Sequence, residues 1–143
     1  YVNLRLPGVL CSFSKKIRHR PWINSISYKF LKNEDVYIYN PKSKFNNLIS
    51  TDELKKIIFK IIKIKVAIKK NFNIGSSNPL TLEKMTNIMK KTLKSRSSII
   101  IKKTNKLSFL ISKNKIEKFL NHKIGSTQNI IRKHLLKKVN SQI

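Results

Sequence analysis

The side chains that could do acid–base chemistry are few in this sequence and widely separated. The six acids are Glu34, Asp35, Asp52, Glu53, Glu83 and Glu117. A hydrolase with paired carboxylates needs two acids that converge in one cleft, whereas helix starts and surface positions account for most of these acids. Tyr1 and Arg5 have the spacing of a Tyr-x-x-x-Lys dyad but lack the lysine. The sequence therefore predicts no catalytic residue within these 143 residues.

Motifs for metals and phosphates are also missing from the sequence. The single cysteine, Cys11, allows neither an intramolecular disulfide nor a zinc cage built from cysteines. The three histidines, at positions 19, 122 and 134, lack nearby carboxylates at ligand spacing. The three glycines stand alone, so no glycine-rich phosphate loop is present. We expect neither a metal site nor a dinucleotide-binding turn here.

Composition and charge set the broad class of the protein. The 143 residues carry 32 Lys and Arg against 6 Asp and Glu, a net charge of +26, and 40% are hydrophobic, enough for one packed domain. The purest apolar run is Ile99-Ile100-Ile101, far below the roughly 18 residues of a membrane helix. The first residues do not resemble a signal peptide. We expect a cytoplasmic protein without a membrane partner.

The high positive charge is typical of proteins that bind nucleic acid. However, Lys supplies 27 of the 32 positive residues, and Ile, Lys and Asn together make 64 of 143. Codons rich in A and T encode these three amino acids, so compositional bias at solvent-facing positions explains the lysines, and bidentate phosphate contacts would favour arginine. A lysine-rich, ribosome-associated nucleic-acid-binding α/β protein is the alternative function. A non-catalytic α/β interaction module is a third.

Hydrophobic patterns that favour strands and helices alternate along the chain and predict an α/β fold. We expect strands at 1–6, 36–39, 45–49, 71–74 and 98–102, and helices at 21–33, 51–63, 81–93, 112–120 and 127–139. The helix at 51–63 has the clearest pattern, with Ser50 or Thr51 as its cap. Its expected buried stripe is Leu54, Ile57, Ile58, Ile61 and Ile62, and its expected solvent face is Lys55, Lys56, Lys60 and Lys63.

A series of short motifs covers essentially the whole chain. They are LRLPGVL (4–10), PWI (21–23), YNP (39–41), FNNLISTDEL (45–54), FNIG (72–75), PLTL (79–82) and LISKNKI (110–116). In order and spacing they resemble the C-terminal half of the NAD-dependent epimerases and dehydratases, the extended short-chain dehydrogenase/reductases that act on nucleotide sugars. The resemblance implies the C-terminal part of a Rossmann-type NAD(P)-binding fold with its small substrate-binding α/β portion.

The resemblance also divides the chain and implies the cofactor, NAD or NADP. Residues 1–11 would be the last part of the Rossmann domain, a strand plus a Pro-Gly-Val turn, and residues 12–143 the substrate-binding portion. In the family this turn lies against the nicotinamide, so Pro7, Gly8 and Val9 are the candidate cofactor-binding residues; a glycine lets backbone approach a flat ring closely. A plain turn after a strand is the other interpretation.

The candidate substrate-binding residues follow from the same resemblance. Asn46 stands where the family commonly has a phosphate-binding arginine, and an amide supplies a hydrogen bond but no charge. Arg18, Arg20 or Lys44 would then neutralise the diphosphate. Trp22 falls in the substrate-loop region, where its indole could stack on a base; an anchor for the following helix is the other interpretation.

The family's glycine-rich dinucleotide turn and Tyr-x-x-x-Lys pair precede the equivalent of Tyr1. The resemblance therefore implies a fragment that supplies the sugar-nucleotide side of an epimerase or dehydratase and is inactive alone. The expected partners are a nucleotide sugar and the missing N-terminal half. A homodimer is compatible with this interpretation, and nucleic acid is the disfavoured partner.

Overall fold

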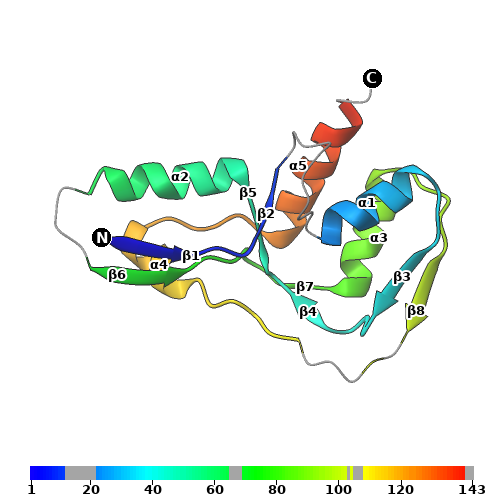
Figure 1. The fold of residues 1–143 in the computed structure, drawn as a ribbon, viewed down its shortest axis with the longest axis horizontal. Helices are drawn as coiled ribbons and strands as arrows, with labels where there is room; N and C mark the ends of the chain where they lie inside the picture. Colours follow the sequence, from blue (N-terminus) through cyan, green and yellow to red (C-terminus); the bar gives the residue numbers. More distant parts are fainter. Residues whose placement is uncertain (12–21, 65–68, 103, 105–107, 141–143) are drawn as a thin grey trace.

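The strands of the described chain form four pairs (Figure 1). The computed structural model describes residues 1–11, 22–64, 69–102, 104 and 108–140. Three pairs are parallel: β1 (Val2–Arg5) with β6 (Lys70–Asn73), β2 (Gly8–Leu10) with β5 (Leu48–Ser50), and β3 (Val36–Tyr39) with β8 (Ile99–Lys102). The fourth pair, β4 (Lys44–Phe45) with β7 (Leu80–Thr81), is antiparallel. Parallel neighbours need long crossovers, and here helices supply much of them.

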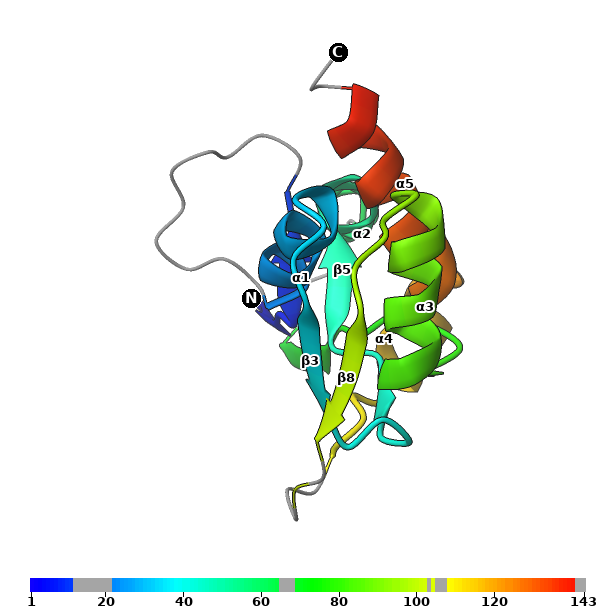
Figure 2. The same cartoon turned by 90° about the vertical axis from the view of Figure 1, so that its right-hand side faces the viewer.

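The helices gather around these pairs in two groups. They are α1 (Trp22–Leu31), α2 (Thr51–Ile62), α3 (Leu82–Thr92), α4 (Asn114–Leu120) and α5 (Thr127–Asn140). In Figure 1, α2 and α4 lie with β1 and β6, whereas α1 and α3 lie with β3 and β8 and α5 stands between the groups. Figure 2 shows β3 and β8 side by side, with α3 alongside them. Within the described ranges, no helix is long and apolar enough to cross a membrane.

Two hydrophobic clusters form the core, and β5 joins them. The first cluster has Leu10, Ile23, Phe30, Val36, Ile38, Leu48, Met85, Met89, Ile130, Ile131 and Leu135. The second has Ile49, Ile57, Phe72, Ile74, Ile116, Leu120 and Ile124. Neighbours on a strand point to opposite faces, so Leu48 enters the first cluster and Ile49 the second. Both clusters also contact side chains from residues 1–11, and a domain division at residue 11 stays a prediction.

The expected α/β fold is confirmed, and so are all five expected helices, with shifts at their ends. The strand expected over residues 1–6 is confirmed as β1, but the turn expected at Pro7, Gly8 and Val9 is wrong in extent, because Gly8 and Val9 belong to β2. Pro7 has no backbone N–H and interrupts β1, and the Gly8 N–H then donates to the Asn47 carbonyl at 3.2 Å. The extended piece expected at 45–49 is likewise divided between β4 and β5.

The buried stripe expected on α2 is partly wrong. Ile57 is fully buried, and the Ser50 hydroxyl caps the helix by accepting from the Glu53 N–H at 3.2 Å. However, Ile58 and Ile62 are 40% and 70% exposed, and Phe59 is 61% exposed. The reason is that α2 packs mainly against β5 and α4, which cover the side of the helix that carries Ile57. We call Ile58, Phe59 and Ile62 the exposed α2 stripe.

We expect Ile57→Ala to lower the free energy of unfolding by about 2–5 kcal/mol, because it leaves a cavity in the second cluster. Ile58→Ala on the exposed α2 stripe is the matched control and should cost less than about 1 kcal/mol. Urea unfolding of both variants gives the comparison. Equal losses, or a larger loss at Ile58, would contradict the assigned face.

Candidate functional site

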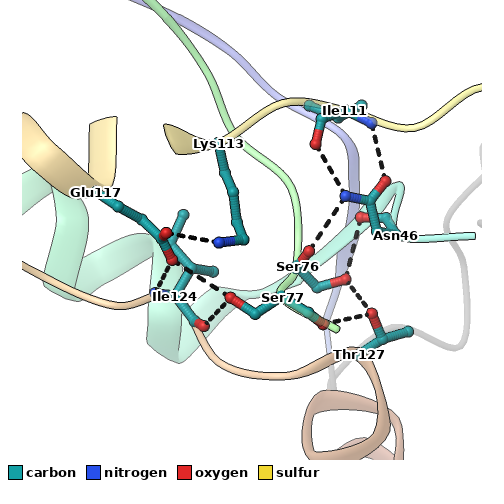
Figure 3. A network of polar contacts seen from close by, with 8 residues as sticks. All are labelled: Asn46, Ser76, Ser77, Ile111, Lys113, Glu117, Ile124 and Thr127. Atoms are coloured by element: carbon teal, nitrogen blue, oxygen red, sulfur yellow. Dashed lines mark hydrogen bonds and ion pairs between the residues drawn. The ribbon is translucent and has the colours of Figure 1, made fainter. Parts of the chain in front are cut away.

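A network of polar contacts around Asn46 holds three chain segments together (Figure 3). Asn46 is 3% exposed. Its amide Nδ2 donates to the carbonyl oxygens of Ser76 at 3.2 Å and Ile111 at 2.9 Å, and its Oδ1 accepts from the Ile111 N–H at 2.9 Å. The Ser76 hydroxyl donates to the Asn46 carbonyl at 3.1 Å. Asn46 therefore fixes the link between β4 and β5 to the segments that follow β6 and precede α4.

Gly75 lies where the segments approach closely, so a larger residue there would need its neighbours to shift. A Cβ atom on Gly75 would lie 3.0 Å from the Ile111 Cβ and 3.3 Å from the Asn46 Nδ2. These distances are shorter than ordinary packing allows, so a side chain would push the Asn46 network apart. Gly75 thus has a packing role, which agrees with its place in the FNIG motif.

The same network anchors the start of α5. The hydroxyls of Ser76 and Thr127 lie 2.7 Å apart, and the Thr127 N–H donates to the Ser77 carbonyl at 2.8 Å. The Ser77 hydroxyl donates to the Ile124 carbonyl at 2.6 Å. Residues that are far apart in sequence are thereby fixed beside the end of β6.

Glu117 is a buried carboxylate at the edge of this network. It accepts from the Ile124 N–H at 2.8 Å and forms an ion pair with the Lys113 ammonium at 2.5 Å. Burial acts to raise the pKa of Glu117, but the hydrogen bonds from Lys113 and Ile124 outweigh burial and hold that pKa below its ordinary value. The carboxylate is therefore stabilised in its charged form.

This pKa shift gives a prediction about acid stability. A carboxyl whose pKa is lowered by folding stabilises the protein above its ordinary pKa of 4.5, and that stability is lost as the pH falls below it. We expect the free energy of unfolding to fall between about pH 5 and pH 3, and less steeply in Glu117→Gln. Urea unfolding across this range measures the slope. Glu83→Gln, at an exposed acid of α3, is the control, and an unchanged slope in Glu117→Gln would contradict the assignment.

A cavity of about 350 Å³ opens beside the network, between α1, β3, β4 and the start of α3. Five aromatic side chains line it: Trp22, Tyr37, Tyr39, Phe45 and Phe109. The edge of the Trp22 ring meets Phe45, with ring centroids 4.9 Å apart and planes at 78°. We call this the aromatic cavity. Its flat apolar walls suit a planar ring.

Two polar side chains of the aromatic cavity, Lys44 and Asn47, can fix the orientation of a bound ligand. Lys44 contributes an exposed cation, and no carboxylate is among the lining residues that the structure describes. Asn47 also lines the cavity, and its Oδ1 is buried without a hydrogen-bond donor among the described residues. A buried acceptor without a donor is unfavourable, and this oxygen is closed to solvent, so a ligand N–H group would satisfy it only once the Asn47 amide turns toward the cavity. The cavity can therefore hold a flat ring with a donor edge and an attached anion.

The structure brings together two of the five candidate substrate-binding residues, Trp22 and Lys44, at the aromatic cavity. Asn46 directs its amide into the network, and Arg18 and Arg20 lie outside the described residues. Their contact with a substrate stays a prediction.

Of the candidate cofactor-binding residues, Gly8 is exposed and Pro7 and Val9 are half-buried. The Gly8 N–H donates to the backbone carbonyl of Asn47, a residue that lines the aromatic cavity, so the start of β2 lies close to that cavity. The role of the three residues in binding a nicotinamide also stays a prediction.

The sequence analysis did not identify Tyr37, Tyr39, Asn47 or Phe109 as site residues. A signal existed for the two tyrosines: Val36 and Ile38 are buried, so the alternating Tyr37 and Tyr39 must share the opposite face of β3. No comparable pattern marks Asn47 or Phe109. Among the residues placed by the structure, no group of three His, Cys, Asp or Glu side chains could hold a metal ion.

Comparison with known proteins adds to this geometry. No protein-family model matches the chain, and no curated protein matches it by sequence. Solved structures do match its fold. The epimerase Mth375 from Methanothermobacter thermautotrophicus has a TM-score of 0.81 at 14% identity, with 98% of this chain and 43% of that chain covered.

Two UDP-glucose 4-epimerases are also similar. The enzyme from Thermotoga maritima, solved with UDP-glucose, has a TM-score of 0.77 at 13% identity over 100% of this chain and 47% of that chain. The enzyme from Thermus thermophilus, solved with NAD, has a TM-score of 0.70 at 12% identity over 98% of this chain and 47% of that chain.

The chain thus has an α/β fold that matches the C-terminal part of Rossmann-type epimerase folds. More narrowly, this fold is similar to that of the C-terminal half of NAD-dependent nucleotide-sugar epimerases, as the sequence motifs predicted. The chain spans less than half the length of the three solved structures described above.

Proposed function

We propose that this chain is the substrate-binding portion of an NAD-dependent nucleotide-sugar epimerase or dehydratase, and that the aromatic cavity takes the nucleotide end of the substrate. The observation that carries the proposal is the combination at one cavity of aromatic walls, the Lys44 cation and the unpartnered Asn47 oxygen. A nucleotide offers the matching groups: a flat base with N–H donors and a phosphate anion. The fold, shared with UDP-sugar epimerases, supports the same assignment.

Each side chain has a separate role in this proposal. The base packs between Trp22 and the neighbouring aromatic rings, and the buried Asn47 amide turns toward the cavity so that its Oδ1 accepts one N–H of the base. Lys44, with Arg18 and Arg20, neutralises the diphosphate. For Asn46 we propose a positioning role, since its hydrogen bonds to Ile111 hold the segment that carries Phe109 against the cavity.

The cofactor of such an enzyme would lie beside Pro7, Gly8 and Val9, at the start of β2. The exposed Gly8 carries no side chain, and its N–H is bonded to Asn47, so one backbone face is left for a flat ring. The residues present therefore fit the nicotinamide end of NAD or NADP. When bound, that group would accept a hydride from the sugar and return it.

Two surface features support a further protein portion in the working enzyme. The exposed α2 stripe is apolar, and large apolar patches on a surface commonly mark contacts. In addition, β1 pairs only with β6 in the described part of the chain, which leaves its other edge free to pair. We propose that an N-terminal portion with the dinucleotide turn and the Tyr-x-x-x-Lys pair covers these surfaces.

The test uses Trp22, the only tryptophan among these 143 residues, and the part of the fluorescence change that Trp22→Phe abolishes reports on the cavity. The longest natural chain that contains these residues is titrated with UDP and with UDP-glucose. We expect a saturable change in fluorescence with both, and at least about tenfold weaker binding in Lys44→Gln. Trp22→Phe is the spectroscopic control. No response up to millimolar UDP, or an equal response to inorganic diphosphate alone, would contradict the proposal.

A further inference from the structure

A second concave surface lies at the opposite end of the molecule from the aromatic cavity, between β6 and α4 (Figure 1). This cleft has a volume of about 650 Å³. Its lining residues are Lys69, Lys70, Asn71, Phe72, Lys115, Lys118 and Phe119. Four of these seven are lysines, two from β6 and the residue before it and two from α4. We call it the lysine cleft.

The positive charge of the lysine cleft is not neutralised by a neighbouring acid. No carboxylate is among its described lining residues, and all four lysines are exposed. The nearest acid along α4, Glu117, turns inward to Lys113 and the Ile124 N–H. The four ammonium groups therefore remain available to an anion from solvent.

An aromatic floor shapes the lysine cleft. Phe72 and Phe119 stack with ring centroids 4.9 Å apart, and Phe72 is buried. The Lys70 ammonium lies over the Phe119 ring, 4.7 Å from its centroid. This cation–π contact restrains the Lys70 side chain at the cleft. Lys70 therefore loses less conformational entropy on binding an anion than an unrestrained lysine would.

From this arrangement we propose that the lysine cleft binds the phosphate backbone of a single-stranded nucleic acid. Lysines act as point charges that follow a row of phosphates without reading base edges, and two rims of lysine along a groove suit an extended polyanion. The concave shape favours a strand over a flat anionic membrane surface. The proposal does not rest on the proposed function, because the cleft and the aromatic cavity share no lining residue.

Compositional bias alone gives a different expectation. With a net charge of +26, any polyanion will be attracted, and every exposed lysine would then contribute equally. The helix α2 and its cap provide a comparison of equal charge, since Lys55, Lys56, Lys60 and Lys63 are also four exposed lysines, of which Lys56 forms an ion pair with Glu53 at 3.9 Å. A site at the lysine cleft predicts unequal contributions from the two groups.

The experiment measures binding of a fluorescent oligo(dT) 15-mer by anisotropy, as a function of salt, to the longest natural chain that contains these residues. The cleft variant carries Lys69→Gln, Lys70→Gln, Lys115→Gln and Lys118→Gln, and the control variant carries Lys→Gln at the four α2 positions. We expect the cleft variant to bind at least about tenfold more weakly, with the slope of log K against log salt reduced by about 3. The control should change less than about threefold.

The double variant Lys115→Gln, Lys118→Gln leaves β6 unchanged and should show about half of the reduction in slope. It retains a testable result if the fourfold variant fails to fold. Equal losses in the cleft and control variants would overturn the proposal in favour of a general charge effect. Tighter, cleft-dependent binding to phosphatidylserine vesicles than to the oligonucleotide would also overturn it, because the cleft would then serve a membrane surface.

Discussion

Residues 1–143 alone are expected to show no binding of NAD, whereas the same residues joined to an N-terminal portion with a glycine-rich dinucleotide turn are expected to bind it. The pyrophosphate of NAD needs backbone N–H groups at a glycine-rich turn and a helix N-terminus. The glycines of this chain are isolated, at positions 8, 75 and 125. The difference should exceed about a hundredfold in affinity, which isothermal titration calorimetry can measure for both proteins.

Gly8→Val in the joined protein is the control for the proposed nicotinamide contact. A side chain at this exposed backbone position should weaken NAD binding by about tenfold if the ring lies against it, with little change in the free energy of unfolding. Binding of NAD by residues 1–143 alone would contradict the fragment interpretation. Failure of the joined protein to bind NAD would contradict the proposed function itself.

Local patterns in the sequence were sufficient for the helices. Ser50 followed by Glu53 at the start of an apolar period predicts α2, and Ser50 is indeed its cap. The same pattern could not decide which of its isoleucines is covered. Ile57 and Ile58 are adjacent and chemically identical, yet Ile57 is fully buried and Ile58 is 40% exposed. The difference depends on which side of the helix β5 and α4 cover, which is a tertiary property.

The residues that line the aromatic cavity could also be predicted only in part from the sequence. Its walls come from segments as far apart as Trp22 and Phe109, and only packing brings them together. Family resemblance identified Trp22 and Lys44 because both lie within or beside matched motifs. It could not show that the Asn46 side chain turns into a structural network, since that depends on Gly75 and Ile111 approaching within packing distance.

Asn46→Ala is expected to lower the stability of the fold and Asn47→Ala to weaken ligand binding, although the two residues are adjacent and of the same type. Asn46→Ala removes three hydrogen bonds between its side chain and the backbone and leaves two groups of Ile111 unpaired. The free energy of unfolding should fall by about 2–4 kcal/mol. Asn47→Ala removes a buried oxygen that has no donor among the described residues, so it should change stability by less than about 1 kcal/mol.

For the affinity for UDP, we expect the larger loss in Asn47→Ala and the smaller loss in Asn46→Ala. If the Asn47 Oδ1 accepts an N–H of the base, Asn47→Ala should weaken UDP binding by about tenfold, because one buried hydrogen bond in the complex is lost. Urea unfolding and Trp22 fluorescence measure the two effects in the same samples. A stable Asn46→Ala variant with weakened UDP binding would contradict the positioning role and indicate that Asn46 contacts the substrate directly. Unchanged UDP binding in Asn47→Ala would show that the Asn47 Oδ1 forms no hydrogen bond with the base, and would contradict its place in the site.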